Sequence, residues 1–230
     1  MRLSLTVLAF LLSLNLFSQS VSSPDLPGEL KIQIGSNFLI DNPDSMDTGF
    51  WGSKAFNAQY LYSVQFGQSA VSFHPGFGIG TDKFSFDNNV TLTRDADGSI
   101  NITPLSPVEF GSVKKTKLAV TYLEVPLEFR FHFNKDNFKK SIKLIVGGKM
   151  GLRLSSHTKV KFDDQGQSQI LKLKDSYELN DFRFGVHGGL GIAGISIYYY
   201  YALNELFKGG NGPEGTDTFQ TQVGIAISVF

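Results

Sequence analysis

The side chains best suited to metal binding or proton transfer in this chain of 230 residues are four histidines, His74, His132, His157 and His187. A zinc site needs such groups at short, defined spacings, usually together with cysteines or carboxylates. No two of the histidines stand at that spacing, and the chain has no cysteine. We therefore expect no metal site, no cofactor and no catalytic residues.

A glycine-rich run at residues 74–80 (HPGFGIG) looks at first like a phosphate-binding loop. Such a loop aims backbone N–H groups at phosphate from the start of the helix that follows it. No helical period follows Gly80, so we interpret the glycines as spacers within a strand.

Two acidic stretches offer oxygen ligands for calcium: Asp41, Asp44 and Asp47 in one, and Asp95 and Asp97 in the other. Neither stretch matches a full calcium-binding loop. Turn formation explains these residues equally well, because Asp and Asn favour turns. Calcium binding is therefore an open alternative, and we predict no metal.

The most charged candidate strand alternates with a period of two. Its apolar face consists of Leu123, Val125, Leu127, Phe129, Phe131 and Phe133. Its polar face consists of Glu124, Pro126, Glu128, Arg130 and His132. Successive side chains of a strand point to opposite faces. Either an apolar core with water outside, or a polar interior with lipid outside, would suit this strand.

The same period recurs elsewhere and predicts seven more strands, at residues 29–40, 55–67, 70–80, 141–154, 181–192, 195–203 and 218–230. Basic residues on their polar faces are Lys143, Lys149, Arg153, Arg183 and His187. With Glu124, Glu128, Arg130 and His132 they form a predicted charge network in the interior. Charges persist in an interior only when they are paired and hydrogen-bonded.

The connections between the eight predicted strands alternate in length. Long ones cover residues 41–54, 81–112, 155–180 and 204–217, and short ones cover 67–69, 134–140 and 193–194. This alternation, with an even number of strands, is typical of outer-membrane barrels and places both chain ends on the periplasmic side. We predict an all-β fold, an eight-stranded antiparallel up-and-down transmembrane β-barrel. Its narrow interior favours the polar, glycine-rich face inside.

The strand that ends at Phe133 begins near Val113, and there Lys115 and Lys117 occupy positions that become apolar from Leu123 onward. Two explanations are open. Either a β-bulge near residues 119–122 changes the parity, or the outer part of the strand stands clear of the bilayer. Pro126 cannot donate to the strand ladder, which predicts a bulge or a break in pairing there.

The first 18 residues have the pattern of a secretory signal peptide, with Arg2 before an apolar run and cleavage expected after Ser18. An uncut N-terminal anchor is the alternative. Residues 19–28 then form a short leader and residues 29–230 the barrel. The 21 basic and 21 acidic residues balance, so nothing indicates nucleic-acid binding.

Several segments resemble one family. They are residues 122–127 (YLEVPL), the Ser18-Gln19 context, the strand from Phe182 to Gly191 and the terminal Phe230. They are similar to the outer-membrane β-barrels common in Bacteroidetes, the porin-family or PorT-like proteins, which are OmpA-like eight-stranded barrels. The resemblance implies a small outer-membrane barrel, usually without enzymatic activity. Phe230 is the candidate insertion signal for the barrel insertion machinery, although it is one step out of phase with the apolar parity.

We therefore expect a non-enzymatic protein of the Gram-negative outer membrane, exported through the periplasm, with a narrow polar-filled lumen. It would act through long extracellular loops or partner contacts, in envelope structure, adhesion or secretion. Lys114, Lys115 and Lys117 either meet anionic lipopolysaccharide or form a solvated strand edge. The alternatives are a soluble, lipocalin-like barrel that binds a small apolar ligand, and an outer-membrane hydrolase.

Overall fold

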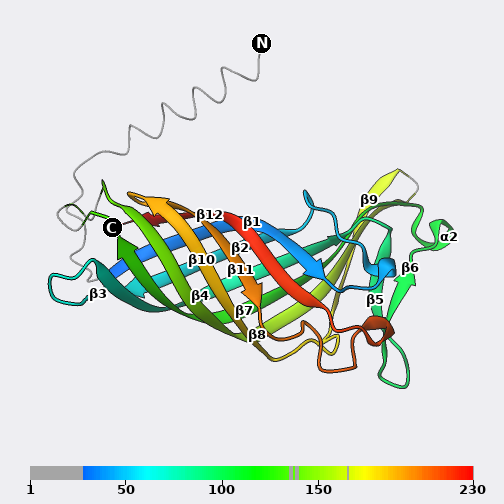
Figure 1. Cartoon of the computed structure of the whole chain (residues 1–230). Helices are drawn as coiled ribbons and strands as arrows, with labels where there is room; N and C mark the ends of the chain where they lie inside the picture. Colours follow the sequence, from blue (N-terminus) through cyan, green and yellow to red (C-terminus); the bar gives the residue numbers. More distant parts are fainter. Residues whose placement is uncertain (1–27, 135–136, 138–139, 165, 230) are drawn as a thin grey trace, which may run out of the picture.

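Eight long strands close into a ring in the computed structural model of the chain (Figure 1). The structure describes residues 28–134, 137, 140–164 and 166–229. The predicted signal peptide at residues 1–18, residues 19–27 of the leader and Phe230 lie outside the described residues. The ring strands are β1 (Gly28–Ile40), β2 (Lys54–Tyr62), β4 (Val71–Phe86), β7 (Ser112–His132), β8 (Ile142–Asp164), β10 (Phe182–Ile192), β11 (Ile195–Ala202) and β12 (Phe219–Val229).

Neighbouring strands of the ring are antiparallel. β12 pairs with β1, and β10 pairs with both β8 and β11, which closes the ring. β1 begins and β12 ends at the same end of the barrel, because Leu30 pairs with Val229. We call this the inner end, and the opposite end, where the long connections lie, the outer end. The predicted eight-stranded up-and-down barrel is thus confirmed.

The apolar face of each ring strand points out of the barrel, and the polar face points in. On β7, Leu123 and Phe129 are 42% and 43% exposed, whereas Glu124 and Glu128 are 0% and 1% exposed. Such a continuous apolar exterior suits lipid and would be unfavourable in water. The lipocalin-like alternative requires an apolar interior, and the burial pattern contradicts it.

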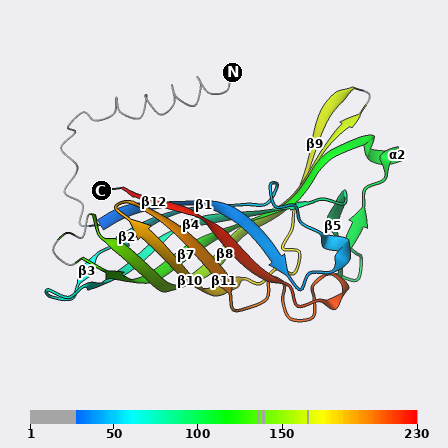
Figure 2. The same cartoon turned by 45° about the horizontal axis from the view of Figure 1, so that its top comes forward.

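Two ring strands, β4 and β8, extend farther toward the outer end than we predicted, and β7 begins at Ser112, next to its predicted start near Val113. β4 continues to Phe86, and β7 and β8 pair as far as Ser112 and Asp163. β9 (Gln167–Lys174) pairs with the outer part of β8, and Figures 1 and 2 show this hairpin leaning away from the barrel axis. The prediction of loops at residues 81–112 and 155–180 was therefore wrong in these parts. The alternation continues there, but lysines replace apolar residues on the outward face.

The parity of β7 does not change between Lys115 and Leu123, because Lys115 and Lys117 lie on the same outward face as Leu123. A register shift between Val113 and Lys115 lies farther out. The register between β7 and β8 does shift between Thr121 and Tyr122, inside the range where we predicted a bulge. The shift arises in β8, where one extra residue is inserted. The outward lysines therefore belong to an outer strand segment that lies beyond the apolar part of the barrel exterior, which we call the apolar band.

The extra residue of β8 is Leu154, since Thr121 pairs with Ser155 and Tyr122 pairs with Arg153. At Pro126 the register between β7 and β8 continues without a shift. The bulge predicted at this proline is absent from the described pairing, but the predicted break in pairing is confirmed toward β4, where the ladder passes from Pro75 with Leu127 to Gly78 with Glu124 and skips Val125 and Pro126.

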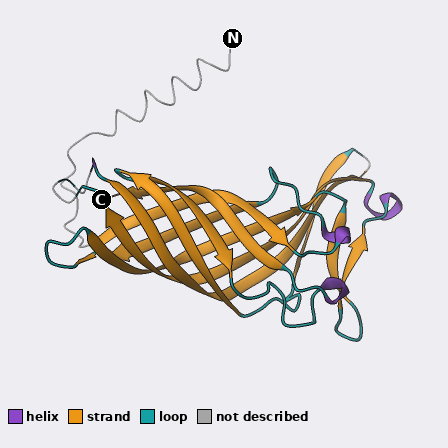
Figure 3. Cartoon of the chain, viewed as in Figure 1, coloured by secondary structure: helices purple, strands orange, loops and turns teal. Residues whose placement is uncertain are grey.

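Loops and short elements cover the outer end (Figure 3). They include β5 (Val90–Arg94) paired with β6 (Ile100–Pro104), the helix α2 (Pro107–Phe110) and 3₁₀ turns at Asp44–Met46 and Pro213–Gly215. At the inner end, β3 (Val64–Gln65) pairs with β4. Apolar side chains of the loops and of β4 and β7 form a buried cluster that we call the outer cap: Met46, Phe84, Phe86, Val90, Leu92, Ile100, Leu118, Val120, Tyr122, Tyr177, Leu179, Leu206 and Phe207.

Candidate functional site

Charged side chains from different ring strands meet in the middle of the lumen. Arg183 of β10 forms ion pairs with Asp82 of β4 and Glu124 of β7, and its Nη2 lies 2.5 Å from Glu124 Oε1. Lys149 Nζ of β8 lies 2.9 Å from the same oxygen. These four side chains are at most 5% exposed. We call them the outer lumen cluster.

A second group, the inner lumen cluster, centres on Glu128. Glu128 accepts hydrogen bonds from Lys31 of β1 and from Arg130, whose Nη2 lies 3.0 Å away. His187 Nε2 of β10 lies 3.2 Å from Glu128 Oε1. Arg130 Nη1 also donates to Glu29 Oε2 at 2.9 Å. Hydrogen bonds between ionised partners such as these are shorter and stronger than neutral ones.

Amide side chains complete the outer lumen cluster. Gln59 of β2 donates to Glu124 at 2.9 Å, and Gln222 of β12 donates to Asp82 at 2.8 Å. Gln220 accepts a hydrogen bond from Arg183 at 2.9 Å. A buried ion pair is tolerated only when such extra bonds satisfy its remaining lone pairs and protons. The cluster therefore ties together strands from opposite parts of the ring.

Aromatic rings fill the space beside the cations. The Arg183 guanidinium carbon lies 4.0 Å from the centroid of the Tyr122 ring, and Lys149 Nζ lies 4.5 Å from that of Tyr200. Gly185 makes room for Tyr200, since a Cβ at this position would lie 2.3–2.4 Å from the ring atoms. Two cavities of about 10 Å³ each border these residues. Side chains therefore fill this part of the narrow interior.

The structure separates the nine residues predicted for the charge network. Six lie in the two lumen clusters: Glu124, Glu128, Arg130, Lys149, Arg183 and His187. Arg153 lies at the outer rim, where it forms an ion pair with Asp181 and donates to Ser156 at 3.3 Å. Lys143 and His132 line a basin of about 480 Å³ at the inner end.

Three charged members of the clusters were missing from our prediction: Lys31, Asp82 and Glu29. Lys31 lies on the polar face of the first predicted strand, so the alternation that identified the predicted members could also have identified Lys31. Asp82 lies two residues beyond Gly80, in a part of β4 that we predicted as loop. Continuing the period of two from Gly80 to the next inward position would have predicted that Asp82 points into the lumen.

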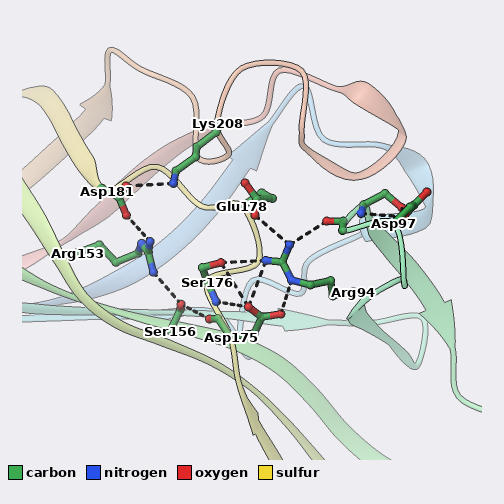
Figure 4. A network of polar contacts seen from close by, with 11 residues as sticks. Arg94, Asp97, Arg153, Ser156, Asp175, Ser176, Glu178, Asp181 and Lys208 are labelled. Carbon is green, nitrogen blue, oxygen red and sulfur yellow. Dashed lines mark hydrogen bonds and ion pairs between the residues drawn. The ribbon is translucent and has the colours of Figure 1, made fainter.

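Arg94, at the end of β5, ties the second long connection to the third (Figure 4). Its Nε lies 2.9 Å from Asp175 Oδ2, and its Nη1 lies 2.9 Å from Glu178 Oε1. Nη1 also donates to the carbonyl of Gly98 at 2.8 Å. The Arg94 hydrogen bonds hold the pKa of Asp175 below its usual value. We call Arg94, Asp175 and Glu178 the loop clamp, because they connect loops that are far apart in sequence.

The acidic stretch at Asp95 and Asp97 forms a turn. Asp97 accepts hydrogen bonds from the backbone N–H and the hydroxyl of Ser99, at 3.0 and 2.7 Å. Asp95 accepts from Asn101 at 2.7 Å. In the part of the chain that the structure describes, no three His, Asp or Glu side chains gather as ligands of a metal ion. Among the same residues, no helix is long and apolar enough to cross a membrane.

Comparison with known proteins gives one family and several similar structures. The family model described as the outer membrane protein beta-barrel domain matches residues 17–208. The chain is similar to Ail, the attachment invasion locus protein of Yersinia pestis, solved with the heparin analogue sucrose octasulfate. The two are 14% identical over 89% of this chain and 100% of that chain, with a TM-score of 0.38.

Neisserial surface protein A is also similar, at 10% identity over 88% of this chain and 97% of that chain, with a TM-score of 0.33. At such identities a likeness concerns the fold alone. No curated protein sequence matches the chain.

Proposed function

The chain belongs to the outer membrane protein β-barrel family, and from this we propose that it is a non-enzymatic, non-conducting barrel that acts through its ordered outer end. Residues 1–18 would direct export, and the insertion machinery would place the barrel in the outer membrane. The PorT-like, Bacteroidetes-type assignment remains part of this proposal. Partners would meet the outer loops, in envelope structure, adhesion or secretion.

The filled lumen is the observation that carries the proposal. The outer lumen cluster contains cations and carboxylates that contact one another directly, with Arg183 bonded to both Asp82 and Glu124. Above it, the outer cap buries apolar side chains from the loops. A solute would have to break buried ion pairs and displace this cap. Removing one partner of a buried pair costs several kcal/mol, so a permanent aqueous path is disfavoured.

The order of the outer end supports a role in binding rather than transport. The loop clamp holds two long connections together through Arg94, and Lys208 Nζ lies 3.1 Å from Asp181 in the same region (Figure 4). The hydroxyls of Ser99 and Ser176 at this rim bond to Asp97, Asp175 and Arg94, whereas a hydrolase needs a general base such as histidine beside its nucleophile. The preformed surface would reduce the entropy cost of binding a partner.

A planar-bilayer recording tests the proposal directly. The refolded full chain should give no stable conductance steps at neutral pH, whereas a general porin in the same bilayer gives them. As a matched comparison, Arg183→Ser removes the cation that joins Asp82 and Glu124, and it should raise the frequency of brief openings. Long-lived openings of the unmodified protein would overturn the non-conducting role.

A further inference from the structure

The outward face of the outer strand segments carries eight lysines. We call this set the lysine face: Lys54, Lys83, Lys115, Lys117, Lys159, Lys161, Lys172 and Lys174. It covers the outer parts of β7, β8 and β9 and continues onto β4 and β2. The opposite face of the same segments packs on the outer cap through Leu118 and Val120. In β4 and β7 one side of this sheet is therefore buried and the other is a basic surface, whereas β9 is exposed on both sides.

The lysines stand directly opposite one another in the sheet. Lys115 pairs with Lys161, and Lys159 stands between Lys117 on β7 and Lys172 on β9. Directly opposite residues have Cβ atoms about 4.5–5.5 Å apart, and like charges at this separation destabilise a sheet. The folded state therefore concentrates positive charge that an external anion would offset.

Among the described residues, no carboxylate pairs with these eight lysines. None of the eight forms an ion pair within the described residues, and the nearby Asp163 is engaged by Lys114, with 3.4 Å between Lys114 Nζ and Asp163 Oδ2. Burial and the neighbours Lys115, Lys83 and Lys159 lower the pKa of Lys117. His157, on the same face, also has a lowered pKa, because of burial and the adjacent lysines.

The lysine face begins just beyond the apolar band and points the same way. Along β4, Ile79 is 52% exposed on the apolar band, Thr81 follows it, and Lys83 begins the lysine face. Four residues of a strand tilted by about 40° rise about 10 Å along the barrel axis. Lysine side chains bend toward polar headgroups from such positions. The face is therefore aimed sideways at the outer leaflet.

Two aromatic side chains, Phe50 and Trp51, lie beside Lys54 of the lysine face. Trp51 is 84% exposed and Phe50 is 45% exposed. Lys54 Nζ lies 5.6 Å from the Trp51 ring centroid and 5.8 Å from that of Phe50. Tryptophan is enriched where a membrane meets water. An exposed tryptophan next to a lysine thus places this part of the surface at the headgroup layer.

We propose that the lysine face binds phosphate groups of outer-leaflet lipid headgroups, as lipid A presents them. Charge complementarity, the sideways orientation and the adjoining Trp51 favour lipid over a soluble polyanion. The inference rests on the outer-membrane placement in the proposed function, but not on a closed lumen. A failure to bind lipid phosphate would leave the bilayer recording unaffected.

Trp51 provides the measurement, because it is the chain's one tryptophan. The refolded full chain in zwitterionic micelles is titrated with diphosphoryl lipid A, while Trp51 emission is followed. Each lysine near an anionic surface contributes about fivefold in affinity. Lys159→Gln/Lys172→Gln should therefore bind about 25-fold more weakly. The matched control Lys140→Gln/Lys143→Gln, which removes two charges at the inner end of the barrel, should bind like the unmodified protein.

Lys161→Gln/Lys174→Gln is a second, independent variant, and heat-dependent gel mobility checks that each protein is folded. Dephosphorylated lipid A should produce little change in emission. Equal affinity of the control and the lysine-face variants would overturn the proposal, as would equal affinity for dephosphorylated lipid. Displacement of the lipid by a soluble sulfated polysaccharide at lower concentration would assign the surface to a soluble polyanion instead.

Discussion

The two charged regions of this barrel use the same strands in opposite ways. In the lumen, Arg183, Lys149 and Lys31 each contact a carboxylate from another strand. On the lysine face, Lys159 stands between two other lysines. Burial explains why only the lumen charges are paired. A charge removed from water needs a partner within the protein, whereas an exposed charge is solvated and remains available to a ligand. The charges that are paired in the lumen therefore stabilise the fold, whereas the lysines without a partner are those we propose to bind a ligand.

The largest effect is expected from Glu124→Gln, which leaves Arg183 and Lys149 buried with less compensation. Breaking a buried pair costs about 3–5 kcal/mol, so the free energy of unfolding should fall by that amount. Urea titration of the protein in phospholipid vesicles measures it. Asp97→Asn, in an exposed turn, is the control and should have little effect. Similar small changes in both variants would show that the lumen pairs do not stabilise the barrel.

Phe129→Arg examines the opposite face of the same strand. The Phe129 ring is 4.9 Å from that of Phe73 on the exterior. Arginine on the lipid side costs about 2–4 kcal/mol near the bilayer midplane and about 0–1 kcal/mol near its edges. Phe133→Arg, at the inner end of the band, should therefore cost much less in the same titration. Equal costs would argue against lipid contact at Phe129.

Gly185→Ala tests how tightly the lumen is filled. The added Cβ would lie 2.3–2.4 Å from Tyr200 ring atoms, and such overpacking typically costs about 1–3 kcal/mol. Gly188→Ala, on the same strand but outside, meets nothing nearer than 3.7 Å and is the control. The temperature at which the folded gel band disappears should drop only for Gly185→Ala. A drop for both would indicate a general effect of glycine replacement on β10.

Lys159→Gln should have a small effect of the opposite sign. In zwitterionic micelles without lipid A, it removes repulsion from Lys117 and Lys172, and the protein should become more stable by up to about 1 kcal/mol. Added salt should reduce the gain, because salt screens exposed charges. Urea titrations at low and high salt measure this. A loss of stability at low salt would mean that the lysines have partners within the chain.

The loop clamp should respond locally to acid. Hydrogen bonds from Arg94 lower the folded-state pKa of Asp175 below its unfolded value. The clamp is thus at full strength above the unfolded pKa of about 3.9 and is lost as pH falls through the lower folded value. Amide hydrogen exchange at residues 95–98 should speed up, beyond the intrinsic pH effect, when pH falls from about 6 to about 2.5. Arg94→Gln should remove the extra pH dependence; if the dependence remains, another group is responsible.

Much of the fold was predictable, because a strand between lipid and a polar interior must alternate. The ring strands, their even number and the alternating connections all followed from that rule. The outer extensions of β4 and β8 did not follow, because Lys83 in β4 and Lys159 and Lys161 in β8 replaced the apolar residues that signalled a strand. The period of two continues there, but its outward positions are occupied by lysines instead of apolar residues.

The period of two also predicted only part of the arrangement of side chains in the lumen. It identifies side chains that point inward, but not their height along the barrel axis. Arg153 shares the inward parity of Lys149, yet it pairs beside the register shift at Leu154 and contacts Asp181 at the rim. Lys143 likewise points inward but lies in the basin at the inner end. Which residues form one cluster depends on register, which the sequence alone does not provide.

The pairing of β1 with β12 has a consequence for biogenesis. Leu30 pairs with Val229, so the seam joins the two described ring strands that lie farthest apart in the sequence. The ring cannot close until β12 is available to pair with β1, and until then the unpaired edges of β1 and its neighbours can pair with other chains. Contacts this distant in sequence form slowly. Those edges therefore stay open to mispairing until β12 has paired with β1.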